Sequence, residues 1–212
     1  MPRTDPKRPT LWIIAGPNGS GKSSAYGMSA VDEPLGAVWI INPDLLATRI
    51  REQERLGDWP ANLEAVRRIE TWLYASVETH QTVGVETVLS TAKYRALVDR
   101  AHERGFVVKL IYVYLDSVDI NIERVAIRVR KGGHAVPVDR IKSRRTRSLE
   151  QLPWFLSAAD FAEIYDNSGA RPRLVFSKSP EEMTAYGRMI PEVVRAIDET
   201  SPGFADDYAE AF

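Results

Sequence analysis

The chain contains no cysteine among its 212 residues. Disulfide bridges, zinc sites built on cysteine and catalysis by a thiol are therefore excluded. A chain of this length buries enough apolar surface to fold without such cross-links. The absence of cysteine also fits a reducing compartment, and we expect the protein to be cytoplasmic.

Long hydrophobic runs and an excess of one charge are also absent. No stretch approaches the ~20 apolar residues of a membrane-spanning helix, and the apolar run at residues 11–15 is too short for the core of a signal peptide. The 28 Lys and Arg residues are balanced by 29 Asp and Glu residues, for a formal net charge of −1. We therefore expect no membrane partner, and the charge balance argues against a nucleic-acid partner.

Short apolar runs alternate with helical patterns along the chain. We predict strands at residues 11–15, 38–41, 82–89, 106–115, 162–165 and 173–177, although a helical extension over residues 157–164 competes with the fifth. We predict helices at residues 22–29, 44–54, 61–79, 92–104, 118–131, 138–156 and 180–199. This alternation predicts an α/β fold with a parallel sheet covered by helices on both faces.

Neither an internal repeat nor a domain linker interrupts the chain, so we predict a single domain over residues 1–212. Residues 201–212 carry three acidic side chains and no Lys or Arg. We expect them to form a loose acidic tail.

A glycine-rich motif follows the first predicted strand and reads Gly16-Pro-Asn-Gly-Ser-Gly-Lys-Ser23. It fits G-x-x-x-x-G-K-[ST], between a strand and a helix as this phosphate-binding motif requires. Glycines let successive backbone N–H groups converge on phosphates, and the helix N-terminus adds partial positive charge. We expect Lys22 to reach the β- and γ-phosphates and Ser23 to bind Mg²⁺. The predicted nucleotide-binding residues are Gly16, Pro17, Asn18, Gly19, Ser20, Gly21, Lys22, Ser23 and Ser24.

A carboxylate follows the second predicted strand, in the segment Asn42-Pro43-Asp44. Ligands of open parallel sheets bind outside the carboxyl ends of the strands. Asp44 is therefore a candidate general base that accepts the proton of an attacking hydroxyl. Helix capping by Asn42 or Asp44, with Pro43 in the first turn, explains the same segment equally well.

A second carboxylate, Glu86, lies in or just past the third predicted strand. A charge in a strand covered on both faces is costly unless it is paired or hydrated. We therefore interpret Glu86 as functional, either binding Mg²⁺ through water or hydrogen-bonding substrate hydroxyls.

Positive charge is concentrated in residues 124–147, which hold nine Lys and Arg residues and one acid, Asp139. Arg124 and Arg128 are four residues apart and share a helix face. Gly132-Gly133 interrupts the segment like a hinge. A solvated helix face is the ordinary explanation of such a run. In a nucleotide-binding chain, however, a lid that closes on the transferred phosphate fits it better.

Taken together, these motifs resemble the zeta toxin family of P-loop kinases. The ordered matches are the glycine loop, Asn42-Pro-Asp44, Glu86-Thr87, the stretch from Arg124 to Gly132-Gly-His-Ala-Val-Pro137, and Tyr165-Asp-Asn-Ser168. The resemblance implies a P-loop NTPase fold with a parallel five-stranded core sheet and an Arg-rich helical lid. It also implies ATP or GTP with Mg²⁺ as donor, UDP-N-acetylglucosamine as acceptor, and an antitoxin protein as partner.

The resemblance also assigns roles by position. Asp44 matches the general base, Glu86 the acid that holds the sugar substrate, and Arg124 or Arg128 the first lid arginine. Better-known members have Glu-Gly-Thr where this chain has Glu86-Thr87-Val88. His134 stands where the second lid arginine is expected, and Arg128 and Arg130 are possible substitutes.

The resulting hypothesis is an ATP-dependent small-molecule kinase of the zeta toxin type. We interpret Asp44, Lys22, Arg124 and Arg128 as catalytic, and Asp44, Glu86, Thr87, Arg130 and His134 as substrate-binding. One alternative keeps the fold and changes the acceptor to an antibiotic, a nucleoside or a polynucleotide. Another is a nucleotide-dependent switch ATPase with no acceptor.

Overall fold

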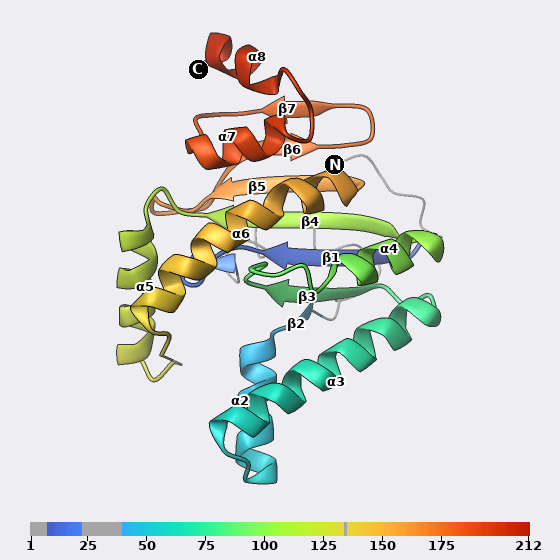
Figure 1. The fold of residues 1–212 in the computed structure, drawn as a ribbon, viewed down its shortest axis with the longest axis vertical. Helices are drawn as coiled ribbons and strands as arrows, with labels where there is room; N and C mark the ends of the chain where they lie inside the picture. Colours follow the sequence, from blue (N-terminus) through green and yellow to red (C-terminus); the bar gives the residue numbers. More distant parts are fainter. Residues whose placement is uncertain (1–7, 23–39, 134) are drawn as a thin grey trace.

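The structure is a computed structural model that describes residues 8–22, 40–133 and 135–212 (Figure 1). Residues 1–7, 23–39 and 134 lie outside the described residues. The strands are β1 (Thr10–Ala15), β2 (Ile40–Ile41), β3 (Val83–Thr87), β4 (Val107–Tyr114), β5 (Phe161–Asp166), β6 (Arg173–Lys178) and β7 (Met183–Ala185). The helices are α2 (Pro43–Glu54), α3 (Asp58–Glu78), α4 (Arg95–Glu103), α5 (Val118–Arg130), α6 (Val138–Ala158), α7 (Pro191–Asp198) and α8 (Phe204–Ala211).

The strands form one seven-stranded sheet in the order β2-β3-β1-β4-β5-β6-β7. The pairs from β2 to β5 are parallel, whereas β6 pairs antiparallel with β5 and β7 antiparallel with β6. The sequence predicted a parallel five-stranded core and a sixth strand, whereas the whole sheet has seven strands and is mixed, because β6 and β7 are antiparallel to their neighbours. The connection from β5 to β6 is too short for the helical crossover that a parallel neighbour needs, so the chain turns back on itself.

Two central strands hold the sheet together. Every residue of β1 and of β4 is buried, as expected for parallel strands with elements on both faces. β1 lies between β3 and β4 in parallel register. The segments that follow β1, β2, β3 and β4 therefore leave the sheet at the same edge, toward which the arrowheads point in Figure 1.

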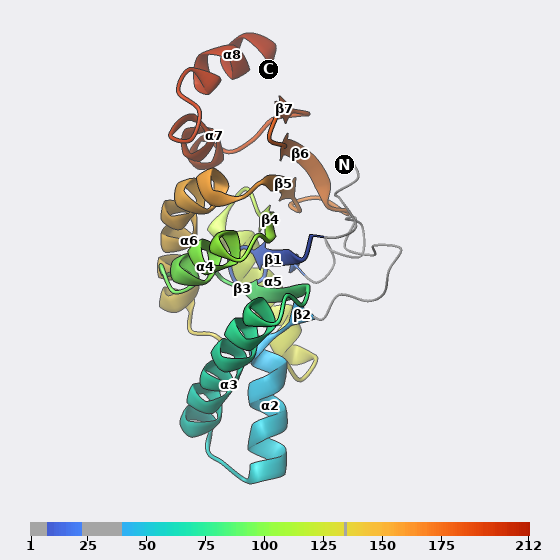
Figure 2. The ribbon, with the colours of Figure 1, turned by 90° about the vertical axis from the view of Figure 1, so that its right-hand side faces the viewer.

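One face of the sheet is covered by α3, α4, α6 and α7 (Figure 2). Their apolar side chains join the sheet in one large core, in which Leu73, Val98 and Phe155 are at most 2% exposed. A smaller cluster on other sheet residues includes Trp12 and Ile111. The helix predicted at residues 22–29 falls mostly outside the described residues, so helical cover of a second face stays a prediction. Among the described helices, none is long and apolar enough to cross a bilayer.

The C-terminal region differs from two predictions. A single helix over residues 180–199 was expected, but β7 pairs with β6 and only α7 is helical, beginning at Pro191. Proline fits the first turn of a helix and breaks one in its interior, so Pro191 begins α7 instead of continuing an earlier helix. Residues 201–212 are not a loose tail, because they contain α8. The Phe204 ring of α8 lies 5.6 Å from that of Phe176, and Tyr208 accepts a hydrogen bond of 2.7 Å from the backbone N–H of Met189.

Candidate active site

The glycine loop begins directly after β1, at the sheet edge where the parallel strands end. Gly16, Gly19 and Gly21 all have positive φ angles, of 146°, 76° and 83°. A side chain on Gly16 would also collide with the backbone carbonyl of Val113 in β4. Glycine is thus required both by the backbone conformation and by the close approach of a neighbouring strand.

Lys22 folds back over this loop and is 8% exposed. Its Nζ donates hydrogen bonds to the carbonyl oxygens of Gly16 at 2.9 Å and Pro17 at 3.2 Å. Glu86 Oε1 lies 4.0 Å from the same ammonium. The buried cation is therefore held beside the loop, where a bound phosphate chain would meet it.

Glu86 reaches the loop because β3 is the neighbour of β1. It lies opposite Ile14 in the parallel register, and its side chain is 12% exposed. The structure thus brings together the loop lysine and the carboxylate that the sequence singled out. Thr87, the last residue of β3, lies opposite Ala15 and accepts a hydrogen bond of 3.0 Å at Oγ1 from Leu89 N–H. Its hydroxyl is thus engaged in the turn that ends the strand.

The Asn-Pro-Asp segment begins α2 at the same sheet edge. Asn42 Oδ1 accepts a hydrogen bond of 3.3 Å from the backbone N–H of Leu45, which makes Asn42 the N-cap, and Pro43 is the first helical residue. The sequence left open whether Asn42 or Asp44 caps this helix, and the structure shows that Asn42 does. Asp44 lies in the first turn of α2, and its side chain lies outside the described part of the structure.

Arg124 extends from α5 toward the end of the loop at Gly21. Its Nη1 lies 3.7 Å from the position that a Cβ on Gly21 would occupy. Its Nη2 donates a hydrogen bond of 3.4 Å to the carbonyl oxygen of Gly169, after β5. Lys22 and Arg124 therefore bring positive charge to the loop from two different elements.

The other predicted site residues differ in where they lie relative to the loop. Arg128 is one turn beyond Arg124 on the same helix face and packs its stem against Gly133, whose Cβ position lies 2.6 Å from Arg128 Cγ. Arg130 is exposed and lies six residues past Arg124, on a side of α5 turned away from it. Ser23, Ser24 and His134 lie outside the described residues.

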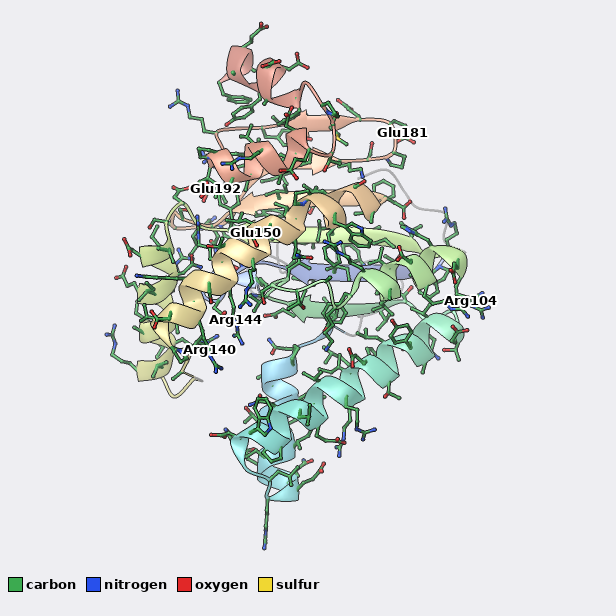
Figure 3. The ribbon with its side chains drawn as sticks, viewed as in Figure 1. Arg104, Arg140, Arg144, Glu150, Glu181 and Glu192 are labelled. Atoms are coloured by element: carbon green, nitrogen blue, oxygen red, sulfur yellow. The ribbon has the colours of Figure 1, made fainter. Side chains whose placement is uncertain are left out.

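Gly132, in the pair that the sequence likened to a hinge, forms the C-terminal end of α5. It has a φ of 86°, and its N–H donates to Val129 O at 2.9 Å while Gly133 N–H donates to Arg128 O at 3.0 Å. This pair of bonds is the Schellman arrangement of a helix C-terminus. Figure 3 shows Arg140 and Arg144 extending from the first half of α6, near the sheet edge that carries the loop.

Two site residues were not predicted from the sequence as part of the loop's support. Asn121 of α5 and Asn167 after β5 each donate a side-chain hydrogen bond of 2.7 Å to a loop carbonyl, of Asn18 and Ser20 respectively. Asn167 belongs to the segment Tyr165-Asp-Asn-Ser168 that the sequence analysis noted. Asn121 offered only one signal, an amide on the helix face that also carries Arg124.

Comparison with known proteins identifies the family of the chain. The zeta toxin family matches residues 2–171 of the chain. The chain belongs to the zeta toxin family. A relative from Haemophilus influenzae, described as an uncharacterized protein, is 31% identical over 147 residues, which are 65% of this chain and 98% of the relative.

Solved structures share the fold of this zeta toxin family member. A chain of the AvrRxo1-ORF1:-ORF2 complex with ATP superposes with a TM-score of 0.68 at 16% identity, and the match covers 92% of this chain and 64% of that one. A chain of the PezAT chromosomal toxin–antitoxin system of Streptococcus pneumoniae gives a TM-score of 0.64 at 14% identity, covering 93% and 87%. A putative kinase from Chloroflexus aurantiacus gives 0.52 at 16% identity, covering 68% and 78%.

Proposed function

We propose that this chain is a kinase that transfers the γ-phosphoryl group of ATP or GTP to a hydroxyl of a small molecule. The observation that carries the proposal is the meeting of Lys22, Glu86 and Arg124 around one glycine loop at the edge where the parallel strands end. Its membership of the zeta toxin family supports the proposal. So do the fold neighbours, one crystallised with ATP and another described as a putative kinase.

The positively charged side chains near the loop would stabilise the charge that develops during transfer. Phosphoryl transfer spreads negative charge over the equatorial oxygens of the moving group, and positioned cations stabilise that charge. Lys22, held by two loop carbonyls, is suited to the β- and γ-phosphates. Arg124, next to Gly21, is suited to the γ-phosphate. Arg128 continues the same face of α5, whereas Arg130 and His134 are kept as weaker candidates for the second lid cation.

Asp44 has the role of general base. As the acceptor oxygen bonds to the γ-phosphorus, the bond from that phosphorus to its bridging oxygen breaks, and the nucleoside diphosphate leaves. The hydroxyl proton passes to the Asp44 carboxylate. Because Asn42 caps α2, the helix does not require Asp44 for its cap. Glu86 and Thr87 are proposed to position the acceptor.

The implied Mg²⁺ ion can be tested against the donor groups. Among the described residues, no group of three His, Cys, Asp or Glu side chains could hold a metal. One carboxylate, Glu86, does lie beside the loop lysine. This fits Mg²⁺, which is usually held by one or two protein groups and by substrate phosphates. Ser23 would hold the ion directly, Glu86 would bind it through water only if it does not contact the acceptor, and the ion would neutralise phosphate charge.

The acceptor and the partner are proposed from the family. We favour UDP-N-acetylglucosamine or a similar nucleotide sugar as acceptor. An antitoxin protein is the proposed partner, since the neighbour from Streptococcus pneumoniae belongs to a toxin–antitoxin system.

The test is product analysis by mass spectrometry. The full chain is incubated with ATP and Mg²⁺, once with UDP-N-acetylglucosamine and once with a cell metabolite extract. We expect a compound that gains one phosphate, together with ADP. Asp44→Ala should keep nucleotide binding and lower phosphoryl transfer by roughly 10²–10⁴-fold. Lys22→Ala should abolish both binding and transfer.

Asp206→Ala is the matched control, because Asp206 is also an aspartate in the first turn of a helix but belongs to α8. Full transfer by Asp44→Ala would remove Asp44 from the mechanism. ATP affinity retained by Lys22→Ala would overturn the loop assignment. ADP and free phosphate without a phosphorylated acceptor would favour the switch ATPase. Transfer to a polynucleotide whose binding falls steeply with salt would favour that acceptor class.

A further inference from the structure

Two carbonyl groups of the glycine loop are held from outside the loop by asparagine side chains. Asn121 Nδ2 donates to Asn18 O, and Asn167 Nδ2 donates to Ser20 O, both at 2.7 Å. The two asparagines are 0% and 5% exposed. They come from different elements, α5 and the segment after β5, so the loop is held from two sides.

Holding a carbonyl also orients an N–H group. The carbonyl of Asn18 belongs to the same planar peptide as the N–H of Gly19, and the carbonyl of Ser20 to the same peptide as the N–H of Gly21. In a trans peptide the C=O and N–H bonds point in opposite directions, and the structure contains no cis peptide among its described residues. The two amides that fix the carbonyls therefore aim the Gly19 and Gly21 N–H groups away from them, toward the inside of the loop, where phosphates bind.

Both asparagines are fixed in place by close contacts with the loop or the sheet. The backbone carbonyl oxygen of Asn121 lies 2.7 Å, and Val125 Cγ2 lies 3.2 Å, from the position of a Cβ on Gly19, so α5 packs directly on the loop. Asn167 donates its backbone N–H to Tyr114 O of β4 at 3.1 Å. Its side chain occupies the space that a Cβ on Gly21 would need.

Packing alone does not account for an asparagine at position 121. Its Oδ1 is buried and has no hydrogen-bond partner among the described residues. A buried polar atom without a partner destabilises a fold, and an apolar side chain of the same shape would avoid this cost. The amide is therefore retained at some cost to stability, which fits a role in the loop's function.

We propose that Asn121 and Asn167 are positioning residues that fix two peptide planes of the glycine loop, so that its N–H groups are preformed for a polyphosphate. The inference rests on the proposed function only in requiring that this loop bind a nucleotide. It does not depend on the acceptor.

The test replaces each asparagine by leucine, which has nearly the same branched shape and no donor. Asn62→Leu is the matched control, since Asn62 Nδ2 also donates a 2.7 Å bond to a carbonyl, that of Asp58, on the exposed side of α3. Binding of ATP and of inorganic tripolyphosphate is measured by calorimetry with Mg²⁺. Each active-site variant should bind both ligands about tenfold or more weakly. The control should bind like the natural chain.

Glycine amide signals separate positioning from a general structural effect. In the chain labelled with ¹⁵N-glycine, ATP should shift the Gly19 and Gly21 signals. Asn121→Leu should reduce the shift of Gly19 most, and Asn167→Leu that of Gly21. Thermal unfolding of each leucine variant is also measured, and its midpoint should change little. A variant that loses affinity only because it is unstable would unfold at a clearly lower temperature.

If a leucine variant does not fold, the alanine variant at the same position is measured, because alanine removes the donor without adding a charge. Unchanged affinity and unchanged glycine shifts in folded variants would overturn the inference and leave the proposed function standing. Failure of the natural chain itself to bind ATP would overturn both.

Discussion

At residue scale, a few residues with a Cβ adopt the left-handed backbone conformation that favours glycine. Among the described residues other than glycine, Arg55, His80 and Leu89 have positive φ angles of 54°, 56° and 58°. This region costs a residue with a Cβ roughly 1–2 kcal/mol. His80 is supported by a helix-end pattern in which Gln81 N–H donates to Ser76 O at 2.8 Å. Arg55, directly after α2, is exposed.

Arg55 therefore offers a test of backbone strain. We expect Arg55→Gly to raise the free energy of unfolding by about 0.5–1 kcal/mol, because glycine adopts this conformation without strain. The measurement is urea denaturation followed by circular dichroism. Arg49→Gly, at an exposed position inside α2, is the control and should lower stability by about 1 kcal/mol. Shifts of the same sign in both variants would contradict the explanation.

At the scale of elements, α2 and the first half of α3 form a hairpin that extends away from the sheet, while the second half of α3 packs on the sheet (Figure 1). Its apolar contact is small and consists of a cluster around Ala47, Ile50, Ala61 and Ala65. An ion-pair network adds to it.

The network is centred on Arg68 and Glu64. Arg68 of α3 donates to Glu54 of α2 at 2.6 and 2.9 Å and to Glu64 of its own helix at 2.6 Å. Arg67 also donates to Glu64, at 2.8 and 2.6 Å. The hairpin therefore depends partly on ionised carboxylates.

This dependence predicts sensitivity to acid. Hydrogen bonds from Arg67, and then from Arg68, lower the pKa of Glu64 from 4.5 to about 2. A lowered pKa in the folded state means that Glu64 contributes stability above pH 4.5, and that this contribution is lost as the pH falls toward 2. We expect Glu64→Gln to be less stable than the natural chain at pH 7, and the difference to shrink across this window. Unfolding measured by urea at several pH values gives the difference. Glu52→Gln, an exposed glutamate of α2, is the control. A difference that does not change between pH 4.5 and pH 2 would speak against the network.

At the scale of the whole molecule, the candidate site and the C-terminal packing lie in different parts of the sheet. The candidate site lies where the parallel strands β1 to β5 end, whereas β6 and β7 extend the sheet beyond β5, and α7 and α8 lie in that C-terminal region (Figures 1 and 2). Residues 124–147, from α5 into α6, hold nine of the 28 Lys and Arg residues and a single acid. The formal net charge of −1 is therefore an average over unlike regions.

This separation predicts that α8 matters for stability and not for nucleotide binding. Phe204→Ala should lower the free energy of unfolding by roughly 1–3 kcal/mol, less than for a fully buried phenylalanine because Phe204 is only partly buried. Phe212→Ala, at a ring that is 44% exposed, should have a much smaller effect. Thermal unfolding measures stability, and calorimetry with ATP should find the natural affinity in both variants. Weaker ATP binding by folded Phe204→Ala would mean that the two regions are coupled.

The sequence by itself determined the features that follow from local rules. The glycine loop needs positive φ angles, which the motif supplies at Gly16, Gly19 and Gly21. Asn42 and Pro43 begin α2 by ordinary capping chemistry. The boundaries of α5 and α6 also agree with their apolar periodicity to within a few residues, and a strand over residues 161–166 replaces the competing helical extension.

Only the tertiary structure decided the features that depend on distant neighbours. Pairing with β6 makes a strand of β7, and contact with Phe176 helps to fix α8, although neither segment has a strong local signal. Asn121 and Asn167 meet loop residues 103 and 147 positions away in the chain. Such contacts exist only once the sheet has set its strand order, because a hydrogen bond between distant residues depends on where each element is carried and leaves no periodic pattern in the sequence.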